Sequence, residues 1–258
     1  MMKPNYVDQC LNFCCNIAHE LVRNGAEMYR VEESARRILS AYGFENPEVF
    51  AIPACILITV QSEGHNYTKS VRIHSSANNL DKLEKLNSLC RQVCFERTAL
   101  DEADERLHTI MSEPDYPLWV SYLGYGSVAF FFTLLFGGVL FDAAISFCCG
   151  LIVKITTSKM TKMNANVFFV NLIASMFLVT VPVFLRFLVV PIHPDKVIIG
   201  AIMLLVPGVA ITNVMRDVIV GDFLTAISKL TEVLIVALAI AIGIALPYGF
   251  ARVVFGVI

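Results

Sequence analysis

The sequence predicts an α-helical polytopic membrane domain with five transmembrane helices, preceded by a small α+β cytoplasmic domain. The first observation behind this prediction is an uneven distribution of charge. Residues 1–117 hold 12 of the 20 Lys/Arg and 17 of the 22 Asp/Glu, whereas residues 118–258 hold only eight and five. The second is a series of five apolar segments after residue 117, most of them near the roughly 20 residues that a spanning helix needs. We therefore divide the chain into a cytoplasmic domain, 1–117, and a transmembrane domain, 118–258.

The charge balance also excludes one class of partner. The two predicted domains carry net charges of −5 and +3, so neither has the strongly basic surface of a nucleic-acid-binding protein. Polar residues from Asp8 to Glu20 interrupt any signal-peptide core near the start, so we expect the first domain to stay in the cytoplasm.

The cysteines of the first domain fit a reducing compartment. Cys10 and Cys14, like Cys90 and Cys94, are four residues apart on predicted helices, a spacing that permits a metal or redox pair. Neither a CxxC motif nor a histidine at ligand spacing accompanies them. We expect small buried apolar side chains here, and neither a metal site nor a cofactor.

Periodicity defines the elements of the cytoplasmic domain. Apolar residues recur at helical spacing up to Gly25 and again over residues 27–41. Stretches rich in β-branched and aromatic residues then predict three strands, at least two of which form a hairpin. These are 48–52, 55–61 and 67–74, and helices return over 79–96 and 99–111.

The second helix carries a charged motif, GAEMYRVEESARRI. Its charged residues include Arg30, Glu32, Glu33 and Arg37, at spacings that allow ion pairs along one helix face. Two interpretations remain open for this face. It is either a solvated charged surface or a domain or subunit contact.

Hydrolytic chemistry has few candidate residues. They are His19 with Glu20, and His65 or His74 with Ser75 and Ser76. A nucleophile needs a base within hydrogen-bond reach and a third group that orients it, and no spacing here defines such a set. We expect no catalytic residues and no enzyme activity.

The predicted spans are 118–138, 139–155, 167–190, 197–214 and 230–250. The second is short. Lys154, Lys159 and Lys162 follow it, so the positive-inside rule places that loop in the cytoplasm. Counting spans in both directions puts the N-terminus in the cytoplasm and the C-terminus outside.

The stretch from Val197 to Asp222 is unusual for a membrane helix. It contains Pro207-Gly208, Asn213, Arg216 and Asp217. Broken backbone and ionisable groups at membrane depth are tolerated only beside protein or a watery cavity. We interpret Pro207-Gly208 as a break that starts a half-helix, whose free N–H groups face an anion. A proline kink with Arg216 and Asp217 at the headgroups is the alternative.

Other acids complete the candidate substrate and ion pathway. They are Asp142, Asp222 and Glu232, the last being close enough in sequence to pair with Arg216. Small residues at four-residue spacing in the last helix, Ala237, Ala241 and Ala245, allow close approach of another helix. Five spans form a small bundle, so we expect a partner chain or self-assembly.

The motifs GAEMYRVEESARRI, ACILITVQSEG, VRIH and LVPGVAITNVMRDVIVGD occur in an order that resembles the threonine/serine exporter family. The resemblance implies proton-coupled export of a small metabolite across the bacterial cytoplasmic (inner) membrane. It also implies the large subunit of a split form that acts with a small membrane subunit, unless the chain forms a homo-oligomer. Threonine and serine, or a dicarboxylate such as succinate, are the implied substrates. The alternative function is a membrane-anchored regulatory or sensory protein whose cytoplasmic domain binds a ligand or partner.

Overall fold

The computed structural model describes residues 4–74, 78–114, 116–188 and 190–255, and the chain forms two compact units. The first unit comprises Met1–Pro114 with Arg216–Ser228, and the second comprises Asp115–Met215 with Lys229–Ile258. A short segment late in the chain is therefore part of the first unit.

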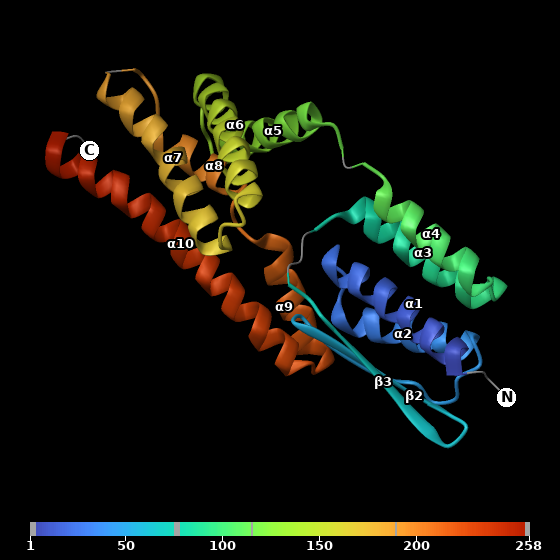
Figure 1. The fold of residues 1–258 in the computed structure, drawn as a ribbon. Coiled ribbons are helices and arrows are strands. Elements are labelled where there is room, and N and C mark those ends of the chain that lie inside the picture. The colour runs from blue at the N-terminus through green and yellow to red at the C-terminus, as the bar shows by residue number, and fades with distance from the viewer. Residues whose placement is uncertain (1–3, 75–77, 115, 189, 256–258) are drawn as a thin grey trace. The chain divides into compact units, whose positions relative to one another are not determined.

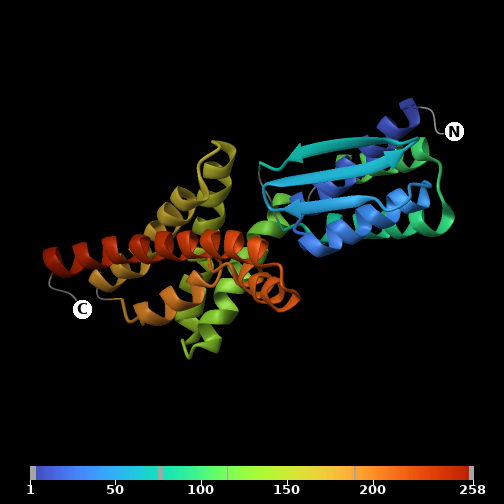
Figure 2. The same ribbon diagram turned by 90° about the horizontal axis from the view of Figure 1, so that it is seen from below.

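The first unit combines a small sheet with two layers of helices (Figure 2). In chain order its elements are α1 (Pro4–Arg23), α2 (Met28–Ala41), β1 (Glu48–Ile52), β2 (Cys55–Ser62), β3 (His65–Arg72), α3 (Leu80–Glu96) and α4 (Leu100–Ser112). Helices α1 and α2 pack on one face of the sheet, and α3 and α4 pack against them. The predicted helices and strands of this region are confirmed to within a few residues.

The sheet is an antiparallel meander in the order β1-β2-β3. Along β2, Ile56, Ile58 and Val60 are buried while the residues between them are more exposed. This alternation is the period of a strand with one face against the core. The β2–β3 connection is only two residues long, Glu63-Gly64, and both have positive φ, as the primed hairpin turns require.

Cysteines occupy the helical core of this unit. Cys10, Cys14 and Cys15 of α1 and Cys90 of α3 are buried, as expected of small apolar side chains. Burial raises the pKa of Cys15 to about 11 and that of Cys90 to about 12. These thiols are therefore protonated at neutral pH, and a protonated thiol is a poor nucleophile and metal ligand.

The second unit is helical (Figure 1). The helices after residue 117 are α5 (Leu118–Leu135), α6 (Leu140–Lys162), α7 (Val167–Phe187), α8 (Pro194–Ile202), α9 (Gly208–Val220) and α10 (Phe223–Phe255). Among the described residues, four helices are long and apolar enough to cross a membrane. They are Leu118–Leu135, Leu140–Lys162, Val167–Phe187 and Phe223–Val253.

Three sequence-based expectations about these helices need correction. The expected span over 197–214 is two short helices, α8 and α9, because the backbone breaks between them. The second span is not short: α6 has 23 residues and continues beyond residue 155 to Lys162. The last helix begins at Phe223 rather than near residue 230, and its 33 residues exceed what a bilayer crossing requires.

Helix α8 lies among the other helices of the second unit, in contact with α5, α6 and α7. Its residues Val197, Ile198, Gly200 and Ala201 are buried. The contact with α5 is very close, because a Cβ added at Gly200 would lie 2.0 Å from Oγ1 of Thr133. The first half of the broken segment is thus an integral part of the bundle core.

Candidate functional site

The backbone break after α8 is the first component of the candidate site. Helix α8 ends at Ile202, and α9 begins at Gly208 directly after Pro207. Proline lacks an N–H and its ring clashes with the preceding turn of a helix, which explains a new helix start at this position. Pro207 is half-buried and Gly208 is exposed.

The new helix start leaves backbone donors available. The N–H of Ile211 donates to the carbonyl of Pro207, whereas those of Val209 and Ala210 have no acceptor among the described residues. First-turn amides carry the positive end of the helix dipole, an arrangement that favours anions. Asn213 lies one turn further along α9 and is half-buried.

The second component is the carboxylate of Asp142, which is fully buried at the start of α6. Its Oδ1 accepts a hydrogen bond from the backbone N–H of His193 at 3.0 Å, and its Oδ2 lies 2.9 Å from Nδ1 of the same residue. The backbone N–H of Val139 also donates to Oδ2, at 3.1 Å. The His193 side chain is 61% exposed, so the pair joins a buried acid to an accessible imidazole.

Sequence reasoning selected Asp142 but missed His193. The two residues are 51 positions apart, and their contact depends on the packing of α6 against α8. The sequence near His193 offers one indication of its place in the fold: it directly precedes Pro194, the first residue of α8.

Arg216 and Asp217 lie in the second half of α9, which belongs to the first unit. Asp217 is buried, and Arg216 forms an ion pair with Glu27 of the same unit. The expected pair between Arg216 and Glu232 joins residues of different units and stays a prediction.

Asp222 has a local structural role in the observed fold. Its Oδ1 accepts a hydrogen bond from the backbone N–H of Thr225 at 3.1 Å, the geometry of a helix N-cap. This bond stabilises the start of α10. Glu232, in the second unit, is exposed on the same helix.

The charged motif on α2 forms ion pairs as its spacing predicts. Arg30 pairs with Glu27 at 3.0 Å, and Arg37 pairs with Glu33. Glu32 differs from the others, because its Oε1 also accepts a hydrogen bond from the backbone N–H of Ala51 at 2.9 Å. It therefore ties α2 to β1, and a role of this face in subunit contact stays a prediction.

The candidate hydrolytic residues form no defined set. Nδ1 of His19 lies 3.0 Å from Glu20, its sequence neighbour. His65 and His74 are exposed, and Ser75 and Ser76 lie outside the described residues. Within the described part of the chain, no three His, Cys, Asp or Glu residues gather as a metal site would require.

Comparison with known proteins gives similarity over most of the chain. The family model of the threonine/serine exporters matches residues 12–250. A Mycobacterium tuberculosis protein named "Probable threonine/serine exporter" is 21% identical over 239 residues, which are 91% of this chain and 45% of that protein. "Pheromone-regulated membrane protein 10" of Eremothecium gossypii is 26% identical over 168 residues, 60% of this chain and 22% of that protein. The chain thus spans less than half the length of these relatives. No solved structure matches.

Proposed function

Because the chain belongs to the threonine/serine exporter family, we propose that it is a transporter subunit that exports a small carboxylate-bearing metabolite. The substrate is threonine or serine, or a dicarboxylate such as succinate. The membrane is the bacterial cytoplasmic membrane, with the N-terminus in the cytoplasm and the C-terminus outside. The observation that supports this proposal best is the helix break at Pro207-Gly208, which separates the buried helix α8 from α9.

The substrate carboxylate would bind at the start of α9. The N–H groups of Val209 and Ala210 are free to donate, and helix starts inside discontinuous membrane helices recur as carboxylate sites in secondary transporters. Asn213 would supply a neutral amide one turn away, which can bond a second polar group of the substrate. Threonine, serine and succinate share the carboxylate, so this site accommodates all three.

Proton coupling requires a group that alternates between charged and neutral forms. The pair of Asp142 and His193 supports this role, because the acid is buried while its imidazole partner is accessible. Asp217, buried on α9, is the second candidate proton carrier. In this scheme His193 transfers protons between water and Asp142.

A small membrane subunit, or a second copy of this chain, would complete the pathway. On α10, Gly243 lies against Leu172 and Ser175 of α7, so that side of the helix is already occupied. Ala237, Ala241 and Ala245 lie on a different face and are exposed. Small residues at this spacing permit close packing of another membrane helix.

Transport in vesicles tests this proposal. The chain would be co-reconstituted with a candidate small subunit, and uptake of labelled threonine, serine and succinate into inside-out vesicles would be followed under an imposed pH gradient. We expect uptake of at least one substrate to depend on the gradient. Asp217→Asn and Asp142→Asn should each abolish gradient-driven uptake while membrane insertion stays normal.

A matched control is Asp195→Asn, which neutralises an exposed carboxylate on α8 and should leave uptake unchanged. Full activity of Asp217→Asn would remove Asp217 from the pathway, and the same result for Asp142→Asn would remove Asp142. Absence of flux for all substrates, with and without the second subunit, would refute the export function.

A further inference from the structure

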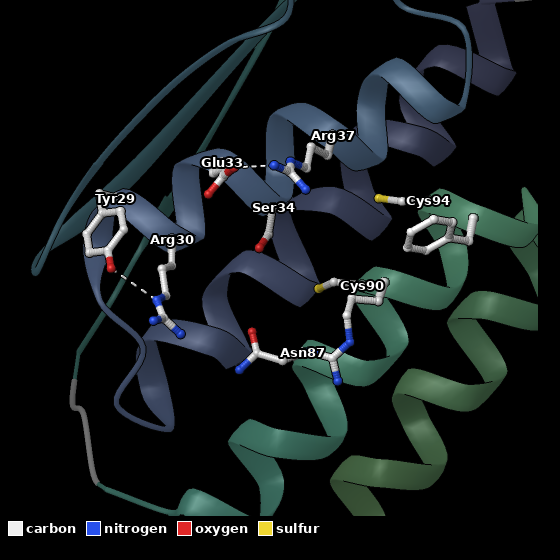
Figure 3. Close-up of a pocket in the computed structure, with 10 residues that line it drawn as sticks. Tyr29, Arg30, Glu33, Ser34, Arg37, Asn87, Cys90 and Cys94 are labelled. Atoms are coloured by element: carbon white, nitrogen blue, oxygen red, sulfur yellow. Dashed lines mark hydrogen bonds and ion pairs between the residues drawn. The ribbon is translucent and has the colours of Figure 1, made fainter.

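The first unit contains a cavity that the transport proposal does not use. It lies between α2 and α3, and its volume is about 410 Å³, within the range of small-molecule sites. Figure 3 shows Arg30 and Ser34 from α2 and Asn87 and Cys90 from α3 around this space. All of its lining residues belong to the first unit.

The charged residues of the lining leave a net positive charge. Three guanidinium groups, of Arg30, Arg37 and Arg91, line the cavity with a single carboxylate, that of Glu33. Glu33 is already paired with Arg37, and Arg30 is paired with Glu27 at 3.0 Å. Arg91 is exposed and forms no ion pair with any residue that the structure describes, so its charge is available to a ligand.

Neutral donors and apolar groups complete the lining. The Ser34 hydroxyl and the Asn87 amide are half-buried beside the arginines, and both can donate to an anionic oxygen. Tyr29 and Phe95 supply aromatic surface. The lining therefore offers fork-shaped cationic donors next to surface that a short carbon skeleton or ring can cover.

Arginines on a helix surface are usually solvated and have no ligand. Another arginine of α2, Arg36, shows how such a residue looks. Arg36 of α2 forms an i,i+4 pair with Glu32 at 3.0 Å and does not line the cavity. Arg30 and Arg37 also form ion pairs, with Glu27 and Glu33. They differ from Arg36 because they line one concave space together with Arg91 of α3, whose charge has no ion-pair partner among the described residues. The uncompensated charge of Arg91, close to two further guanidinium groups, favours the binding of an anion in this space.

We propose that this cavity is a binding site for a small organic anion with carboxylate or phosphate groups. Arginine binds both groups through paired N–H···O bonds, so the shared chemistry is a planar or tetrahedral anionic oxygen group. The site is separate from the start of α9 and binds its ligand whether or not the chain transports the same molecule.

Calorimetric titration of the full chain in detergent tests the proposal. The probes are succinate for the carboxylate class, inorganic phosphate for the phosphate class, and glycine betaine as a small probe without net charge. We expect saturable binding of succinate or phosphate, and the anion with the lower Kd identifies the ligand class. Arg91→Gln should weaken that binding about tenfold or more, since one charge-assisted bond is lost.

The matched control is Arg36→Gln, which removes the same charge from α2 outside the cavity and should leave the Kd unchanged. Arg91→Lys should bind more tightly than Arg91→Gln but less tightly than the wild type, because lysine keeps the charge and lacks the paired N–H donors of the guanidinium group. Binding that is equally strong in the wild type and Arg91→Gln would overturn the assignment, as would the absence of binding by both anions. Vesicle uptake by Arg91→Gln reports on transport separately, so failure of one proposal does not imply failure of the other.

Discussion

The buried carboxylate of Asp142 is bound to His193 twice, through the backbone N–H at 3.0 Å and through ring Nδ1 at 2.9 Å. An ionised carboxylate can only accept hydrogen bonds, so Nδ1 carries the proton in that state. The pair connects the start of α6 to the start of α8. It therefore has a structural as well as a proposed functional role.

Neutralising this acid should loosen the start of α8. In Asp142→Asn one side-chain atom becomes a donor, so fewer acceptors remain for Val139 and His193, and a charge-assisted bond is worth about 1.5–3 kcal/mol. We expect faster hydrogen exchange at the non-proline amides of residues 190–196, measured by mass spectrometry, with little change in α5. Unchanged exchange at these amides would show that the pair does not hold the two helices together.

Close packing of α8 against α5 predicts a steric effect. In Gly200→Ala the new Cβ would meet Oγ1 of Thr133 at 2.0 Å and its backbone N at 2.6 Å. Overpacking of this kind costs about 1–3 kcal/mol, and we expect a lower melting temperature of the detergent-solubilised chain. Gly124→Ala is the control, because a Cβ at Gly124 meets nothing within 4 Å. Equal melting of the two variants would contradict the close contact.

Replacing Pro207 should make the backbone break before α9 shorter or remove it. Pro207→Ala supplies an N–H and relieves the ring clash, so the segment from α8 into α9 can become more helical. We expect normal expression and at least a tenfold loss of vesicle uptake, since about 1.4 kcal/mol lost from substrate binding already accounts for that factor. Pro182→Ala, within the continuous helix α7, should retain more activity. Full uptake by Pro207→Ala would separate the break from transport.

The buried thiols predict a loss of stability at high pH. Burial raises the pKa of Cys90 from 9.0 to about 12, so the folded state holds its proton where the unfolded state releases it. The stabilising contribution is complete below pH 9 and declines as the pH rises towards 12. Urea denaturation of the first unit in the full chain, followed at pH 8 and pH 10, should show this decline. Cys90→Ala should reduce this decline, and Cys55→Ala, at a half-buried thiol outside the helical core, should not.

Local patterns were sufficient for much of the fold. Apolar residues alternate along β2 and recur at helical spacing in α1 to α4, and both patterns indicate an element with one buried face. Such a pattern can be recognised from residues close together in the sequence. The break after α8 was predictable for the same reason, because Pro207 disrupts a helix through its own ring. Helix ends were less predictable where a long apolar run continues, as at Lys162 of α6 and Phe223 of α10.

The sequence by itself determined that this chain has apolar helices after a mixed α+β region, that a helix breaks at Pro207-Gly208, and that Asp142 is an unusual acid within an apolar segment. Only the tertiary structure decided that Asp142 meets His193, that Gly200 lies against Thr133, and that arginines of α2 and α3 line one cavity. The physical reason is the distance along the chain over which each interaction acts. Backbone preferences depend on residues a few positions apart. Each of these contacts instead joins residues far apart in the sequence, and no local pattern indicates that they meet.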